Sequence, residues 1–337
     1  MTERFPNGLD PAAGSAFKLA HLSDLHATPV EIDSPRDLMG KRALGWLSWR
    51  RRRRDEHRPE VLEALIDDLH AQGADHVGVT GDLTHLGLDS EIRAAADWLE
   101  RLGPSSGVTV VPGNHDAYAG RTGAERWAPW ASYMGIQELR LQGPGTLPRT
   151  AGSGKADEDE RGTEGFPWAR RLGAVALVGV SSARPTAPLL ATGRVGARQR
   201  AELETLLLRL AEEGRPRVLL IHHPPLPAGQ SRRRQLDDAE AVRAILARAG
   251  AELVLHGHTH RTHLDRVAGP AGPIPVVGVP SASSIGHRPS RRARYHLYRI
   301  VPAEPGPDGI PRCSLSLEVR GFEASTGGFV GEASGPL

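Results

Sequence analysis

Five short apolar runs in this chain each end abruptly in acidic, amide or imidazole side chains, and this repetition limits the possible folds more than any other feature. The polar residues that follow the runs are, in chain order, Asp24 and His26, then Asp82, then Asn114, His115 and Asp116, then His222 and His223, and finally His258 and His260. A short apolar run bounded by turn residues predicts a buried strand. Ligands of open α/β sheets bind at the carboxyl ends of strands, so we expect these side chains to converge on one crevice.

Helical patterns alternate with the strands in the first part of the chain, which predicts an α/β protein. Residues 59–73 and 89–103 both show apolar positions at helical spacing and end at a glycine. Strand, helix and strand in alternation predict a mostly parallel sheet with helical crossovers. Residues 274–280, 295–301 and 314–322 follow without helices between them, so we expect late, largely antiparallel strands.

The composition excludes several classes of protein. The net charge of +2 does not fit a strongly basic nucleic-acid binder. The single cysteine, Cys313, rules out an intrachain disulfide and a cysteine-rich metal cluster. The first residues lack the apolar stretch of a signal peptide, and no run approaches the roughly 18 apolar residues of a spanning helix. We therefore expect a cytoplasmic protein.

With 337 residues, of which 39% are hydrophobic, the chain can form one large domain. We expect a flexible lead over residues 1–15, a single domain over 16–323 and a C-terminal tail over 324–337. Inside the domain, residues 151–165 have little to bury and predict a mobile loop. Residues 34–57 predict a basic helical insert, in which a helix begins at the N-cap Ser34.

The chemistry of the five clusters is that of a metal site. Carboxylate and imidazole without thiolate suit Zn, Mn, Fe, Co or Ni. The carboxylate of Asp82 stands on a glycine-containing turn and could bridge two cations. Two divalent ions about 3.5–4 Å apart can share a nucleophilic hydroxide and clamp a phosphate for in-line attack. A single Gly-Asp pair usually marks only a turn, but five clusters in order at strand ends favour the metal site.

The motifs D-x-H, G-D, G-N-H-D, H-H-P-P and G-H-x-H, in this order, resemble the calcineurin-like metallophosphoesterase superfamily over roughly residues 17–323. The resemblance implies a four-layer α-β-β-α sandwich with mixed β-sheets and a centre of two divalent or trivalent metal ions, such as Mn, Fe, Zn or Co. On the pattern of the superfamily, the first metal would be held by Asp24, His26 and His260, the second by Asn114, His222 and His258, and Asp82 would bridge them.

The same resemblance implies catalytic roles. His115 would lie beside the phosphate as proton donor to the leaving oxygen or as electrostatic stabiliser, and Asp116 would orient His115. His85 and His256 are candidates for substrate contact, with helix entry and a core position as their respective alternatives. We expect His223 to pack or to bond to the backbone, because adjacent strand residues point in opposite directions.

The motifs are most similar to the class III cyclic nucleotide phosphodiesterases. This similarity implies a phosphodiesterase that cleaves a small phosphodiester by attack of a metal-bound hydroxide. The chain departs from the compact members by its insert, in which residues 41–54 carry seven cations and no acid. Trp46 and Trp49 beside these arginines are typical of a segment that contacts an anionic membrane surface.

The insert keeps alternative functions open. One is a membrane-surface hydrolase of a lipid or nucleotide-sugar-lipid pyrophosphate, similar to the UDP-2,3-diacylglucosamine hydrolases, although those enzymes have Arg where this chain has His115. A plain solvated helix end is the other explanation of the insert. A nuclease would usually bring a DNA-binding domain, and none is visible in the sequence. A non-catalytic scaffold would have gaps in the ligand set, whereas every expected position is filled.

Overall fold

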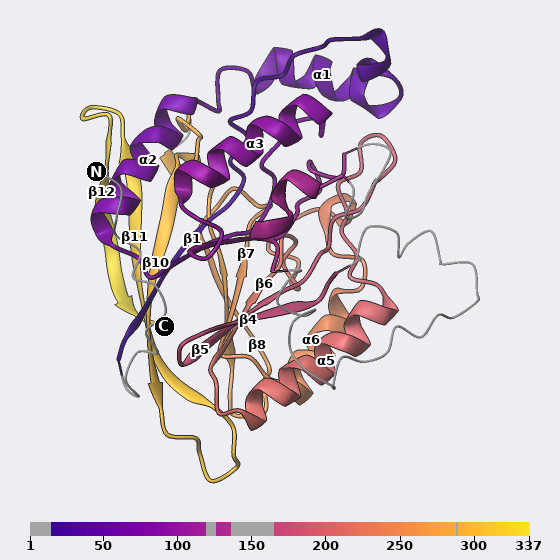
Figure 1. Ribbon diagram of the computed structural model, residues 1–337. Helices are drawn as coiled ribbons and strands as arrows, with labels where there is room; N and C mark the ends of the chain where they lie inside the picture. Colours follow the sequence, from indigo (N-terminus) through magenta and orange to yellow (C-terminus); the bar gives the residue numbers. More distant parts are fainter. Residues whose placement is uncertain (1–14, 119–125, 136–164, 288) are drawn as a thin grey trace.

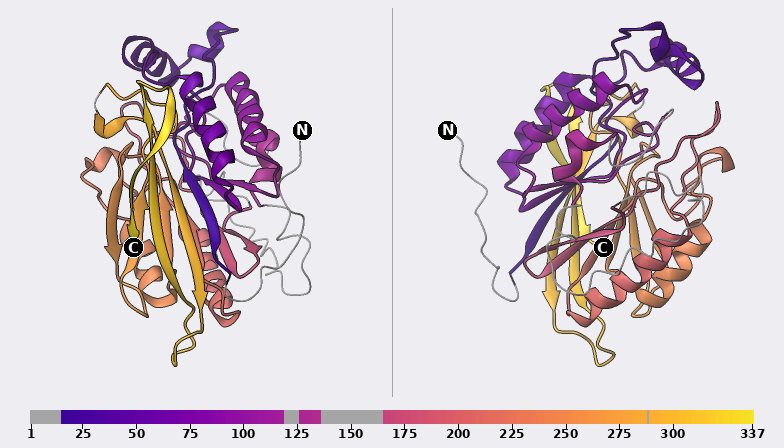
Figure 2. Two further views of the ribbon diagram at one scale, coloured as in Figure 1. Left: turned by 90° about the vertical axis from the view of Figure 1, so that its left-hand side faces the viewer. Right: turned by 45° about the vertical axis from the view of Figure 1, so that its right-hand side comes forward.

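The computed structural model describes residues 15–118, 126–135, 165–287 and 289–337 (Figure 1). All but the last residue of the predicted N-terminal lead, 1–15, lies outside the described residues. All but the last residue of the predicted loop 151–165 also lies outside the described residues. Within the described part, two β-sheets lie face to face and helices cover their outer faces (Figure 2).

The first sheet has six strands in the order β12-β11-β10-β1-β2-β3. Their bounds are Phe17–Leu22 for β1, His76–Val79 for β2, Val108–Val110 for β3, Arg294–Ala303 for β10, Arg312–Glu323 for β11 and Gly328–Pro336 for β12. The strands β1, β2 and β3 are parallel, and β10 joins β1 in the antiparallel direction. The carboxyl ends of β1, β2 and β3 therefore meet at one edge.

The second sheet also has six strands, in the order β4-β5-β6-β7-β9-β8. Their bounds are Trp168–Leu172 for β4, Val175–Gly179 for β5, Arg217–Leu220 for β6, Leu253–His256 for β7, His263–Val267 for β8 and Ile274–Gly278 for β9. The late strands are antiparallel in β10 and β11, as expected. The expectation is wrong for β9, which does not pair with β10 or β11 but lies in the second sheet, parallel to β7 and antiparallel to β8.

Four long helices complete a four-layer α-β-β-α sandwich, the fold that the resemblance implied. Helices α2 (Pro59–Gln72) and α3 (Asp89–Leu102) cover the first sheet, and α5 (Ala197–Glu212) and α6 (Ala239–Ala249) cover the second (Figures 1 and 2). Strands covered on both faces are buried throughout and mostly apolar, which is why the short runs lack polar alternation. Short 3₁₀ helices cover Pro35–Leu38, Ala128–Tyr133, Arg232–Arg234 and Pro289–Arg291.

The basic insert differs from the single helix that the sequence predicts. Ser34 accepts a hydrogen bond from the backbone of Arg36, and with Asp37 it caps only the 3₁₀ turn at Pro35–Leu38. The chain then turns at Gly40, whose φ of 63° favours glycine, and helix α1 begins at Lys41 and ends at Arg52. In Figures 1 and 2, α1 stands out at one end of the molecule.

The predicted C-terminal tail is wrong, because Gly328–Pro336 forms the edge strand β12, paired with β11. A turn closed by the carbonyl of Glu323, which accepts from Thr326 and Gly327, starts this hairpin. Phe329 is buried against Phe322 and Tyr295, with ring centroids 5.6 and 5.7 Å away. The many small residues of this segment hide the strand pattern in the sequence.

Candidate metal centre

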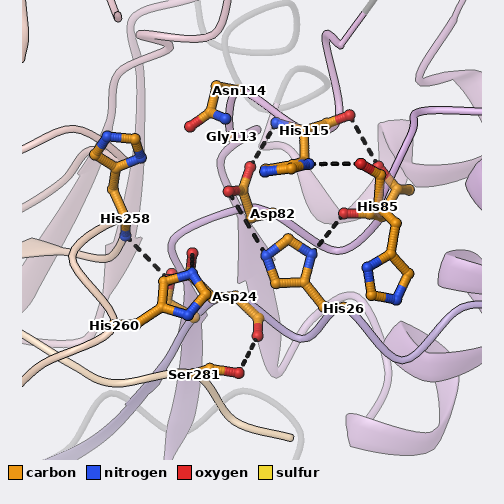
Figure 3. Close-up of polar contacts among 12 residues, drawn as sticks. Asp24, His26, Asp82, His85, Gly113, Asn114, His115, His258, His260 and Ser281 are labelled. Atoms are coloured by element: carbon orange, nitrogen blue, oxygen red, sulfur yellow. Dashed lines mark hydrogen bonds and ion pairs between the residues drawn. The ribbon is translucent and has the colours of Figure 1, made fainter. Parts of the chain in front are cut away.

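The five predicted clusters meet at one edge of the two sheets, and Figure 3 shows residues of four of them, all except the cluster of His222 and His223. They follow β1, β2 and β3 in the first sheet and β6 and β7 in the second. Potential ligand atoms lie within 4.8 Å of one another in four overlapping groups: Asp24, His26 and His260; Asp24, Asp82 and His222; His26, Asp82 and His115; and His222, His223 and His258. The side chain of Asn114 joins them through its Oδ1, which lies 3.1 Å from His222 Nε2.

The backbone at this edge is strained where it aims the side chains inward. Five residues adopt left-handed φ angles, namely Asp24 (52°), His26 (42°), Asp82 (55°), His258 (67°) and His260 (52°). Among the described residues, only Leu189 and Ala228 share this conformation outside glycine. Each such residue costs about 1–3 kcal/mol, so the surrounding structure must hold it in place. Strain of this kind concentrates at functional sites.

In the carboxylates of Asp24 and Asp82, one oxygen accepts a hydrogen bond from a backbone N–H and the other faces the proposed metal centre (Figure 3). Asp24 Oδ2 accepts from the backbone N of His258 at 3.0 Å, which links the loops of the two sheets. Asp82 Oδ1 accepts from the backbone N of His115 at 2.7 Å. The remaining oxygens face imidazole nitrogens: Asp24 Oδ1 lies 3.1 Å from His260 Nε2, and Asp82 Oδ2 lies 3.2 Å from His222 Nε2.

Hydrogen bonds to carbonyl groups determine which imidazole nitrogen faces the centre. His26 Nδ1 lies 2.7 Å from the Thr84 carbonyl, and His222 Nδ1 lies 2.6 Å from the Thr80 carbonyl. A carbonyl only accepts, so these nitrogens carry hydrogen and each Nε2 presents a lone pair when the ring is neutral. This pattern is common for histidines that hold a metal, because the carbonyl fixes the ring and raises its basicity.

The lone pairs that converge here require a positive charge between them. The Nε2 of His222 faces oxygens of both Asp82 and Asn114. The Nε2 of His26 and the Oδ1 of Asp24 are buried and lack a hydrogen-bond partner in the described part of the chain. Buried lone pairs without a donor or a cation are costly. Nitrogen and oxygen donors without thiolate suit Mn, Fe, Zn or Co, so the residues present fit a metal centre.

The lowered pKa values of Asp24 and Asp82 also fit a metal centre, because both carboxyl groups are kept ionised. Burial by itself would raise the pKa of Asp82, but the facing imidazoles of His222 and His115 hold this pKa well below its usual range. Burial also opposes ionisation of Asp24, yet His260 keeps the pKa of this carboxyl lowered. Although burial disfavours a charged His222, the Asp82 carboxylate raises the pKa of this imidazole to about 9.

Asp116 does not contact the His115 ring, so the predicted orienting contact is wrong for the described structure. Its carboxylate accepts instead from the backbone N–H groups of Asp82, Leu83, Thr84 and Gly113 and from the Thr84 hydroxyl. Four of these five bonds tie the loop after β2 to the loop after β3, and the bond from Gly113 lies within the loop after β3. Asp116 therefore positions the backbone of Asp82 rather than the imidazole beside it.

The His115 ring is held by other groups. Its Nδ1 donates to the His85 carbonyl at 2.5 Å, and its Nε2 faces the Arg53 guanidinium, with 3.2 Å between Nε2 and Nη1. Burial lowers the pKa of His115 to about 4, and Arg53 adds to this effect while the Asp82 carboxylate opposes it. The ring lies beside the ligand group, with its centroid 4.9 Å from that of His26.

The three remaining candidate histidines take different places. His85 stacks on His26, with 5.1 Å between ring centroids, and supplies the carbonyl that holds His115. His256 is fully buried and its Nδ1 bonds to the Gly257 carbonyl, so its contact with a substrate stays a prediction. His223 bonds to the Ser182 hydroxyl and the Ala191 carbonyl, which is the packing role expected for it.

Two residues near the centre were missed by sequence reasoning. His57 is buried with its ring centroid 4.8 Å from that of His26, and its Nδ1 lies 3.0 Å from the Ser283 hydroxyl. Arg53 reaches His115 from the insert. Neither belongs to a strand-end motif, and the long-range contacts that place them leave no local pattern. The arginine run was the one available hint, and it did not single out Arg53.

Comparisons with known proteins agree with this geometry. A family model described as calcineurin-like phosphoesterase matches residues 17–262. A probable cyclic nucleotide phosphodiesterase of Synechococcus sp. is 23% identical over 243 residues, which cover 71% of this chain and 77% of that protein. The match to the family model includes all five clusters.

Two solved structures share the fold. Purple acid phosphatase PPD1 from yellow lupin (Lupinus luteus) seeds has a TM-score of 0.56 and 13% identity, with 96% of this chain and 54% of that chain covered. A dimetal phosphatase from Danio rerio has a TM-score of 0.51 and 12% identity, with 94% and 98% covered. At these identities the two structures support the fold alone. Because the family model spans most of the chain, this protein belongs to the calcineurin-like phosphoesterase family and is a metal-dependent phosphoester hydrolase.

Proposed function

We propose that this protein is a phosphodiesterase with a two-metal centre that hydrolyses a small phosphodiester. The observation that carries the proposal is the Asp82 carboxylate, whose Oδ2 faces His26 on one side and His222 on the other. Asp24, His26 and His260 would hold one ion, and Asn114, His222 and His258 would hold the other, with Asp82 between them. When bound, the two ions supply Lewis acidity and a nucleophile at neutral pH.

The residues of the chain would orient the phosphodiester and assist its leaving group. His115 stands beside the ligand group with its ring fixed at Nδ1, so its Nε2 is the atom that would face the substrate. To act as the acid, Nε2 must first gain a proton; burial, aided by Arg53, opposes this by lowering the pKa of His115 to about 4, while the Asp82 carboxylate favours it. General acid catalysis of this kind contributes about 10²–10⁴-fold to the rate.

The preference for a diester over a monoester is supported by one relative. The Synechococcus protein, which is 23% identical, is named a probable cyclic nucleotide phosphodiesterase. A cyclic nucleotide is therefore the first small phosphodiester to test on this chain. The ligand set itself admits several metals, because their N/O sites overlap in affinity.

The test compares hydrolysis of bis(p-nitrophenyl) phosphate and p-nitrophenyl phosphate by protein reconstituted with Mn, Fe, Zn or Co. We expect faster cleavage of the diester, and loss of both metal and activity in Asp82→Ala. The control is Asp265→Ala, which removes a carboxylate from the edge strand β8, separated from β7 by β9. Metal-independent activity, or full activity in Asp82→Ala, would refute the proposal. A higher kcat/KM for the monoester would refute only the diester preference.

A second candidate is hydrolysis of a lipid pyrophosphate at a membrane surface, and the outer face of α1 favours it. Met39, Leu44 and Leu47 are 68%, 54% and 38% exposed, and the side chains of Arg51 and Arg54 are exposed nearby. Apolar groups among arginines bind anionic lipid surfaces. In the part of the chain that the structure describes, no helix is long and apolar enough to cross a membrane.

Flotation with liposomes tests this second candidate. We expect salt-sensitive binding to vesicles that contain anionic phospholipid, and a loss of binding in Leu44→Glu/Leu47→Glu. Vesicles of neutral phosphatidylcholine provide the control. Equal recovery with both vesicle types, or unchanged binding of the double variant, would show that α1 does not form a membrane-binding surface.

A further inference from the structure

Arg53 brings a positive charge to the metal centre from outside the five strand-end motifs. It directly follows α1, and its backbone N–H donates to the Trp49 carbonyl at 2.9 Å. Its side chain is half-buried, and its Nη1 lies 3.2 Å from His115 Nε2, the atom that would face a substrate. A nitrogen of His115 in turn lies within 4.8 Å of ligand atoms of His26 and Asp82. The guanidinium group therefore stands next to the ligand group.

Helix α1, which leads to Arg53, is anchored to loops of both sheets. Arg42 Nη2 donates to the Gly87 carbonyl at 2.7 Å, in the loop that follows β2. Lys41 Nζ donates to the Leu190 carbonyl at 3.0 Å, in the segment that follows β5. The start of α1 thus has fixed partners in both halves of the sandwich.

The chain is held again shortly after Arg53, by the loop that follows β9. The backbone N–H of Ile285 donates to the Glu56 carbonyl at 2.9 Å, and the backbone N–H of Arg58 donates to the Ser283 carbonyl at 2.9 Å. Arg53 therefore lies between two anchored segments. A binding group whose backbone is held in this way loses less conformational freedom when a ligand binds.

The guanidinium group of Arg53 has most of its donors unused. Within the described residues, its one hydrogen-bond partner is His115 Nε2, and no Asp or Glu oxygen forms an ion pair with it. A guanidinium group carries five N–H donors. The buried Arg217, by contrast, is paired with Glu252. A half-buried cation without a carboxylate, placed beside the centre, is suited to bind an anion that enters there.

The spacing of the two facing nitrogens fits a shared oxygen acceptor. An oxygen can lie about 2.9 Å from each of two nitrogens when these are 3.2 Å apart, as Arg53 Nη1 and His115 Nε2 are. A phosphate oxygen that comes within hydrogen-bond distance of His115 Nε2 is therefore within reach of Arg53 as well. One phosphate has enough oxygen lone pairs to bind the metal ions and to accept from a guanidinium group.

We propose that Arg53 binds the same phosphate that the metal centre receives, by donating guanidinium N–H groups to one of its non-bridging oxygens. This inference rests on the proposed function and adds to it a substrate-binding residue that lies in the insert and in none of the five motifs. The planar guanidinium fork matches phosphate oxygens, whereas an ammonium group acts only as a point charge. The insert thus contributes affinity for the phosphate itself.

Calorimetry with inorganic phosphate tests the proposal without relying on turnover. We expect the Mn-reconstituted Arg53→Gln variant to bind phosphate about 10- to 100-fold more weakly than the wild type, the range of a hydrogen bond between charged groups. Its manganese content should stay at the wild-type level, because Arg53 is not a ligand. Arg53→Lys keeps the charge without the fork, so its affinity should lie between those of the wild type and Arg53→Gln.

The matched control is Arg50→Gln, which removes an exposed arginine stacked on Trp46 of α1 and should keep the wild-type affinity. A second comparison separates direct contact from an effect through His115. In a His115→Ala background, Arg53→Gln should still weaken phosphate binding, because the guanidinium group itself touches the phosphate.

Four results would overturn the proposal. They are wild-type phosphate affinity in Arg53→Gln or Arg53→Lys, an equal loss in Arg50→Gln, a loss of manganese in Arg53→Gln, and no further loss from Arg53→Gln in the His115→Ala background. Cleavage of bis(p-nitrophenyl) phosphate by the wild type tests the proposed function separately. Phosphate affinity can depend on Arg53 whether or not a diester is cleaved, so the two proposals can fail independently.

Discussion

The strand-end loops and helix α1 both supply residues to the same centre, but they do so in different physical ways. The loops place buried side chains, with Asp24, His26 and Asp82 at most 1% exposed, through strained backbone and backbone hydrogen bonds. Helix α1 stands at the surface, exposes Leu44 and Leu47, and is anchored by side chains that donate to carbonyl groups. We infer that the loops determine the chemistry and that the helix determines which substrate is accepted.

The largest effect is expected at His115, which lies between the two regions. His115→Ala should lower kcat for a phosphodiester with a poor leaving group by about 10²–10⁴-fold, because in the proposed mechanism His115 is the acid for the leaving oxygen. The loss should be smaller for a p-nitrophenyl ester, whose leaving group needs little protonation. Steady-state kinetics on both esters measure this difference. Equal losses on the two substrates would show that His115 acts in another way.

The next effect concerns the loop that carries Asp82. Asp116→Ala removes the acceptor of four backbone N–H groups and leaves them buried without partners. We expect the free energy of unfolding to fall by about 3 kcal/mol or more, since each unsatisfied group costs about 1–3 kcal/mol. Denaturant unfolding measures the change, and the metal content should fall with it. A stable variant with its full metal content would contradict the role of Asp116 in holding this loop.

Acidification should lower the free energy of unfolding through groups that lie away from the metal centre, as well as through the centre itself. Burial, followed by the charge of Arg170, lowers the pKa of His76 from 6.5 to about 3. Between these values the unfolded chain binds a proton that the folded protein does not, so the stability is fully present above pH 6.5 and is lost as the pH falls. One such histidine contributes a loss of about 2 kcal/mol between pH 6.5 and 5.

Denaturant unfolding of His76→Gln over this pH range provides the measurement. The variant should lose less stability than the wild type on acidification, because the ring that binds the extra proton in the unfolded state is gone. An identical pH dependence in the two proteins would show that His76 is not among the responsible groups. The result also distinguishes unfolding at low pH from the release of metal at low pH.

The smallest effect is expected from moving α1. A Cβ on Gly45 would collide with the Tyr118 hydroxyl and with Leu86, so Gly45→Leu should displace the helix. We expect KM for a phosphodiester to rise about 3- to 10-fold while the metal content stays unchanged, since a shifted helix weakens the contacts of α1 but leaves the strand-end ligands in place. Ala43→Leu on the exposed face of α1 is the control. A loss of metal in Gly45→Leu would contradict the inference that the strand-end loops alone, and not α1, hold the metal.

The sequence predicts the loops better than the helix for a physical reason. A ligand such as Asp82 must be one of few residue types and must stand at a strand end, so the local sequence contains the information. The α-β alternation likewise predicts the layers, because strands covered on both faces must be apolar. The role of Asp116 was predicted wrongly, since the motif identifies the residue but not which of its neighbours it contacts.

The insert and the C-terminal strand are harder to predict because their positions depend on distant partners. The cap at Ser34 was recognised correctly as a helix start, but Gly40 ends that turn before α1 begins. Arg53 is one of five consecutive arginines, and only the anchors of α1 select it to face His115. Strand β12 exists because β11 offers an edge and Phe329 finds a pocket beside Phe322.

The most direct measurement of the central claim is a crystal structure of the Mn-reconstituted protein with anomalous scattering data. The account predicts two anomalous peaks about 3.5–4 Å apart, one on each side of the Asp82 carboxylate and both within bonding distance of it. A single peak that Asp82 does not touch, or peaks that lie away from this edge of the sheets, would contradict it.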